Sequence, residues 1–91
     1  MTRLAVARDL GDRRLEAKCW IQAAFVYFSL HDADKVLEAA EAALALSEEL
    51  GDAMGRAAAL YATALSQARR NDWDAAVQTA SAARAVLAGG G

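Results

Sequence analysis

The sequence predicts an all-α protein built from antiparallel helix hairpins. Three observations predict this class: the composition, a forty-residue repeat and a regular series of helix-end signals. The 91 residues include 25 alanines and 11 leucines and contain no proline. Alanine is the best helix former but fills a core poorly, so this composition predicts helices that pack at close range.

The chain repeats itself at an offset of 40 residues. Leu10-Gly11-Asp12 returns as Leu50-Gly51-Asp52, and the Asp-x-Asp pair at residues 32–34 returns at residues 72–74. Of the 51 residue pairs at this offset, 14 are identical. A fixed period of about 20 to 50 residues is typical of stacked supersecondary units.

Helix-end signals divide each period into two helices. Gly11-Asp12 and Gly51-Asp52 combine a glycine, which suits the left-handed end of a helix, with an aspartate, which suits the N-cap of the next. His31-Asp32 and Asn71-Asp72 are expected to act in the same way within each period. The loops are short, which makes neighbouring helices antiparallel. We therefore expect helices at residues 2–10, 13–30, 33–50, 53–70 and 73–88.

The repeat predicts one partial unit and two complete units. Residues 4–12 align with the end of a second helix at residues 44–52, so residues 1–12 are interpreted as the remnant second helix of a preceding repeat. Residues 13–52 then form the first complete repeat and residues 53–88 the second. Residues 89–91, all glycine, are expected to form a flexible tail. The alternative is an alanine-rich helical bundle without repeat stacking.

Trp20, Ala23-Ala24 and Tyr27 match part of a known repeat motif, which has Trp, two residues, Leu-Gly, two residues and Tyr; here Ala23-Ala24 stands in the place of Leu-Gly. In this respect the chain resembles the tetratricopeptide-repeat family, in a longer variant with Leu-Gly-Asp linkers. The second unit departs from the motif, because Leu60 and Gln67 replace the two aromatic residues. The resemblance implies a short α-solenoid whose first helices line a peptide-binding groove.

Small residues are expected wherever neighbouring helices approach closely in such a stack. Alanine occupies these positions in both units, and it also replaces the aromatic residue that the family places in its second helix. The alanines expected at close approaches are Ala24, Ala43, Ala64, Ala76, Ala80 and Ala83.

An apolar stripe on the first helix of each unit is the candidate binding surface. A helical wheel places three large apolar residues of the first unit roughly 80–140° away from Trp20, and the second unit has an equivalent stripe. Large exposed apolar patches mark interfaces, although the same residues would also serve as core. With the polar residues that flank them, the candidate partner-binding residues are Lys18, Ile21, Gln22, Phe25, Phe28, Tyr61, Leu65 and Arg69.

These features predict a non-catalytic protein-interaction module that binds an apolar or amphipathic peptide segment. A homo-oligomerisation unit, in which the same stripe forms the interface of a homodimer, is the alternative. A sensory domain for a small apolar ligand is a lesser alternative, because the chain offers few convergent polar groups.

Catalytic and cofactor chemistry find no support in the sequence. His31 lies beside Asp32 and Asp34 in a predicted turn, where such residues act as caps, and Cys19 is expected to be buried as a small apolar residue. We therefore expect no enzyme, no metal and no cofactor.

The charge pattern argues against two classes of partner. The net charge is −2, which gives no reason to expect nucleic acid or a membrane surface as partner. The longest apolar stretch, residues 19–28, is about half of what spans a bilayer. A lone cysteine fits a reducing compartment, so a cytoplasmic location is expected. The acidic residues of the middle helix are expected to form a solvated outer face: Glu38, Glu41, Glu48 and Glu49.

Overall fold

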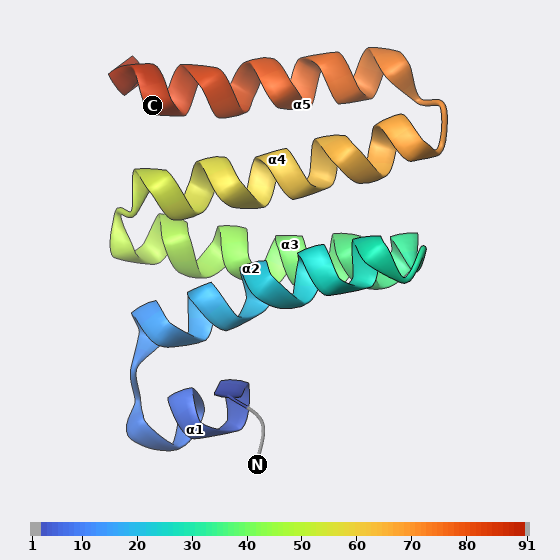
Figure 1. Ribbon diagram of the computed structural model, residues 1–91. Coiled ribbons are helices and arrows are strands. Elements are labelled where there is room, and N and C mark those ends of the chain that lie inside the picture. The colour runs from blue at the N-terminus through green and yellow to red at the C-terminus, as the bar shows by residue number, and fades with distance from the viewer. Residues whose placement is uncertain (1–2, 91) are drawn as a thin grey trace.

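Figure 1 shows the computed structural model of the protein, in which residues 3–90 are described. This part of the chain forms five α-helices and a final π-helical turn: α1 (Arg3–Leu10), α2 (Arg13–Ser29), α3 (Ala33–Leu50), α4 (Ala53–Arg69), α5 (Trp73–Ala85) and the turn Val86–Gly90. The predicted all-α class is confirmed, and the helix ends lie within three residues of those expected. Residue 2, the expected start of the first helix, and Gly91, in the expected tail, lie outside the described residues.

The four connections between helices share one turn geometry. Each has a residue in the left-handed conformation, with φ between 61° and 68°: Gly11, His31, Gly51 and Asn71. The backbone N–H of the aspartate that follows donates to the carbonyl five residues earlier, at 2.9–3.0 Å. This bond satisfies a carbonyl at the end of the helix, as in a Schellman motif. His31 and Asn71 therefore take the part that glycine plays in the other two turns, as predicted.

Three of the four aspartates cap the helix that follows. The carboxylates of Asp12, Asp32 and Asp52 each accept the backbone N–H three residues later, at 3.0–3.2 Å. The same prediction for Asp72 is wrong, because its side chain makes no cap hydrogen bond. Asp72 has the smallest ψ of the four aspartates, 71°, against 82° at Asp32, 94° at Asp12 and 96° at Asp52.

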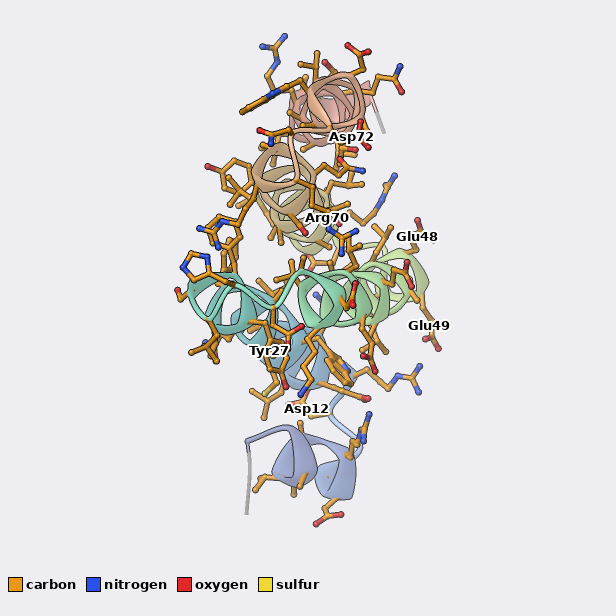
Figure 2. All side chains as sticks on the ribbon, turned by 90° about the vertical axis from the view of Figure 1, so that its right-hand side faces the viewer. Asp12, Tyr27, Glu48, Glu49, Arg70 and Asp72 are labelled. Carbon is orange, nitrogen blue, oxygen red and sulfur yellow. The ribbon has the colours of Figure 1, made fainter. Side chains whose placement is uncertain are left out.

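The helices stack in chain order into a thin array of 39 × 32 × 13 Å (Figure 1). Helices α2 and α3 form an antiparallel hairpin, and α4 packs against both of them. Viewed from the side, α4 lies over the space between α2 and α3, and α5 lies beyond α4 (Figure 2). Within residues 3–90, the only α-helix that α1 contacts is α2, and the only α-helix that α5 contacts is α4. Each end of the stack is thus a helix with a single helical neighbour.

The centre of the stack is a core of small side chains. Ala24 of α2, Ala39 and Ala40 of α3, and Ala62 of α4 are buried together. Around them pack Trp20, Ala23, Phe25 and Tyr27. Since alanine side chains are short, this core requires the helix backbones to approach closely.

Most of the alanines expected at helix contacts are buried. Ala24, Ala43, Ala64, Ala76 and Ala83 are each 7% exposed or less. Ala80 is the exception and is exposed, so this prediction is wrong. The reason is that α5 has no second helical neighbour to cover the face on which Ala80 lies.

A close approach between α3 and α4 depends on the absence of a side chain at Gly55. A Cβ atom placed there would lie 2.4 Å from Oγ of Ser47 and 2.8 Å from Oδ2 of Asp52. Ser47 is fully buried, and its hydroxyl has no hydrogen-bond partner. The serine hydroxyl therefore serves mainly as a spacer of the right size between the two helices.

The capping difference predicts unequal effects at two equivalent positions. Asp52→Ala removes a carboxylate that accepts the N–H of Gly55 and should lower the free energy of unfolding by about 1 kcal/mol. Asp72→Ala removes no such bond and should change it by less than about 0.5 kcal/mol. Urea unfolding of both variants checks this, and equal losses would show that Asp72 caps α5 in solution.

The α3–α4 contact predicts a coupled pair of substitutions. Gly55→Ala should lower the free energy of unfolding by about 1–2 kcal/mol, because the new methyl group meets Ser47. Without that clash, alanine would stabilise the helix by up to about 1 kcal/mol. In a double-mutant cycle followed by urea unfolding, Ser47→Ala should restore part of the loss. A Gly55→Ala variant that is more stable than the original chain would contradict the contact.

Candidate functional site

A continuous apolar groove runs between α4 and α5. It consists of two adjoining hollows of about 420 and 260 Å³, which share Tyr61 and Ala80. Phe25 of α2 reaches into the larger hollow. The remaining lining comes from one stripe on each helix, and we call the whole surface the α4/α5 groove. The α4 stripe consists of Met54, Ala58, Tyr61, Leu65 and Ala68, and the stripe of α5 and the turn that follows it consists of Trp73, Val77, Ala80, Arg84 and Leu87. The floor of the groove contains Ala57, Ala64, Ala76 and Ala83.

Both stripes follow the same spacing, with residues at positions i, i+4, i+7, i+11 and i+14. This spacing keeps all members on one face of a helix. At a rise of about 1.5 Å per residue, each stripe is about 21 Å long, which equals four helical turns. Since α4 and α5 are antiparallel neighbours (Figure 1), the two stripes run side by side along the two hollows.

The large side chains of this groove are left open. Met54, Tyr61, Trp73, Val77 and Leu87 are 53–71% exposed. Contiguous apolar surface of this kind is typical of interaction sites. Arg84 is the only charged residue that lines the two hollows within residues 3–90. The groove can therefore bury apolar surface and offers one guanidinium group at its edge.

Three of the predicted site residues meet in this groove: Phe25, Tyr61 and Leu65. The rings of Phe25 and Tyr61 are tilted by 46°, with their centroids 6.5 Å apart. Phe25 is half-buried and also packs against the alanine core. Phe25 therefore belongs to both the core and the groove. The sequence alone does not decide between these two places for this residue.

Phe28 and Arg69 form a separate contact between α2 and α4. The guanidinium carbon of Arg69 lies 3.7 Å from the ring centroid of Phe28, and its Nη1 donates to the carbonyl of Phe28. The same two side chains and Ser66 enclose a hollow of only about 10 Å³. These two residues therefore hold the helices together at a site outside the groove.

The other predicted residues lie elsewhere on α2. Ile21 is half-buried, and Lys18 and Gln22 are exposed. None of them lines the two hollows of the α4/α5 groove.

Sequence reasoning missed the part of the groove that α5 provides. Trp73, Val77 and Leu87 carry the same helical spacing as the predicted stripe, so the signal is present in the sequence. The prediction followed the first helices of the units, as the family resemblance implies. It is the packing of α5 on α4 alone that leaves these residues uncovered.

The polar groups considered for chemistry lie outside the groove. Cys19 is a buried free cysteine, and His31 is exposed in its turn. Within residues 3–90, no group of three or more His, Cys, Asp or Glu side chains is placed to hold a metal ion. In the same part of the chain, no helix is long and apolar enough to cross a membrane.

The charged residues join successive helices. Arg8 pairs with Glu16, Arg13 with Glu49, and Arg70 with Asp34 at 2.7 Å. All four glutamates expected on the outer face of α3 are exposed, and Glu48 and Glu49 project from it in Figure 2. The acidic face of α3 is thus solvated, as predicted.

Comparisons of the chain with protein-family models, with curated proteins and with solved structures find no match.

Proposed function

We propose that this protein is a short tetratricopeptide-like α-solenoid that acts as a protein-interaction module, and that it binds an amphipathic helix of a protein partner in the α4/α5 groove. The observation that carries the proposal is the pair of uncovered apolar stripes with the same heptad-like spacing on two antiparallel helices. An amphipathic helix presents apolar residues at this spacing and can lie between two such stripes.

The shape of the groove favours a helix over a compact ligand. Alanines line its floor, while Tyr61, Trp73 and Leu87 form its higher edges, so a partner side chain can enter between them. A small apolar ligand would fit the larger hollow by volume, since ligand sites measure about 300–1,000 Å³. It would leave most of the channel uncovered, and it would find only one charged group.

The single charge at the groove favours a different protein over a second copy. In a symmetric pair of copies, each interface would contain the Arg84 of both chains. Two copies of the groove lining would contribute no acidic residue to pair with either Arg84, whereas an acidic residue of another protein would pair with it. We therefore propose a partner helix whose apolar face is bordered by acidic residues, with the homodimer as the competing outcome of the test.

An exposed alanine in the centre of the groove provides the test. The probe is a fluorescein-labelled, 18-residue helical peptide with Leu at positions i and i+11, Ala at positions i+4 and i+7, and Glu at the flanking positions. It should bind the original chain, and Ala80→Glu should weaken binding about tenfold or more. The new carboxylate would fill the apolar channel, repel the Glu residues of the peptide and pair with Arg84 one helical turn away. Fluorescence anisotropy gives both affinities.

Ala82→Glu is the matched control, because Ala82 is an exposed alanine of α5 that does not line the groove. It should leave peptide binding unchanged. Equal weakening by both variants, or no binding to the original chain, would overturn the proposal. A dimer by light scattering that Ala80→Glu converts to a monomer would replace it with the homodimer.

A further inference from the structure

The internal repeat indicates which kind of helix fits the α4/α5 groove. Moving back by 40 residues, the α5 stripe corresponds to five residues of α3: Ala33, Leu37, Ala40, Leu44 and Ser47. The α4 stripe corresponds in the same way to five residues of α2: Arg14, Lys18, Ile21, Phe25 and Phe28. The α4/α5 groove is therefore the second copy of a surface that α2 and α3 form one unit earlier.

The first copy of this surface is occupied by α4. On the α3 side, Ala40 is buried with Ala62, and Ser47 lies against Gly55. Ala33 shares the small hollow that Ser66 lines. Along the α2 side, the Phe25 ring meets Tyr61 and the Phe28 ring meets Arg69. A helix thus covers the α3 side of this surface and its Phe25–Phe28 part, while Arg14 and Lys18 stay exposed; the second copy of the surface is open along both sides.

The face that α4 places on α2 and α3 is built from small residues. Gly55, Ala59, Ala62 and Ser66 are all buried, and they follow the spacing i, i+4, i+7 and i+11. A helix with this face can approach an alanine stripe closely, whereas larger side chains would hold the backbones apart.

The open groove keeps a small residue at its centre and carries larger side chains at its ends. Ala80 is identical to Ala40, which meets Ala62 in the filled copy. Trp73 replaces Ala33 at one end, and Leu87 replaces Ser47 at the other. The occupant therefore needs a small residue opposite Ala80, and near its ends it packs against the side chains of Trp73 and Leu87.

A charge that is unpaired within residues 3–90, at the start of α5, indicates in which direction a partner helix would lie in the α4/α5 groove. Asp34, at the start of α3, pairs with Arg70, just after the end of α4, at 2.7 Å. Its equivalent, Asp74, is exposed at the start of α5 and forms no ion pair within residues 3–90. A helix that lies antiparallel to α5 and carries a basic residue at its C-terminal end would supply the missing charge.

We propose that the α4/α5 groove recognises, in another polypeptide, a helix with the packing face of α4: a Gly, Ala or Ser opposite Ala80, an antiparallel direction relative to α5, and an Arg or Lys beside Asp74. This inference rests on the proposed function and specifies the chemistry of the partner.

The chain itself supplies a probe for the test. A synthetic peptide of residues 52–71 contains the N-cap aspartate, the small-residue face and the two terminal arginines, and it contains no tryptophan. Trp20→Phe in the full chain leaves Trp73, a groove residue, as the only tryptophan. Binding of the peptide should shift the Trp73 emission to shorter wavelength in a saturable way, because this exposed indole becomes covered.

Two peptide variants test whether the small residues of the α4 packing face are required for binding. Ala62→Leu in the peptide should weaken binding about tenfold or more, because the leucine meets Ala80 in the channel. Ala64→Leu, the same change on the opposite side of the helix, should leave binding within about twofold of the original peptide. In the full chain, Asp74→Asn should weaken binding about two- to fivefold and reduce its salt dependence.

The outcomes separate this inference from the proposed function. If the leucine-containing peptide described above binds and the 52–71 peptide does not, or if Ala62→Leu has no effect, the small-face inference is wrong and the proposed function stands. If neither peptide binds, both proposals fail. Ala80→Glu in the full chain should abolish binding of the 52–71 peptide, and binding that survives this change would place the peptide outside the groove and contradict the inference.

Discussion

The close packing of small side chains between successive helices is the constraint on which this structure depends. Where α4 meets α3, the contact consists of Gly55, Ser47 and Ala62 with Ala40, and it leaves no room for a further methyl group at Gly55. Each alanine buries little apolar surface, so a helix gains enough only when it has neighbours on more than one side. Helices α2, α3 and α4 meet this condition, and α5 does not.

The repeated turn geometry turns this constraint into a binding surface. Each turn has a residue in the same left-handed conformation and the same closing hydrogen bond, and the residues of the α2 and α3 surface have their counterparts 40 positions later on α4 and α5. The packing faces that α2 and α3 present to α4 therefore recur on α4 and α5. Within residues 3–90 no further helix covers these second faces, and the α4/α5 groove is the result.

The features that sequence alone predicts are local ones. Helix ends are predictable because a positive φ at Gly51 or Asn71 and a capping aspartate act within a few residues of the chain. Even there, the sequence does not show that the side chain of Asp72, unlike those of the other three aspartates, makes no cap hydrogen bond.

The groove was only half predictable. Tyr61 and Leu65 were expected from helical periodicity, whereas Trp73, Val77 and Leu87 were not. Ala40 and Ala80 make the reason plain: the same residue at the same repeat position is buried in one unit and exposed in the other. Periodicity shows which face of a helix is apolar, and it does not show whether another helix covers that face.

The central claim, that α5 is covered on one side only, is tested most directly by native-state hydrogen exchange. Amides of α5 should exchange through local opening at a lower free energy than those of α3 and α4, since α5 has one helical neighbour and each of the others has two or more. The same measurement would contradict the account if the α5 amides were protected as strongly as those of α3, because that protection would require the open face of α5 to be packed.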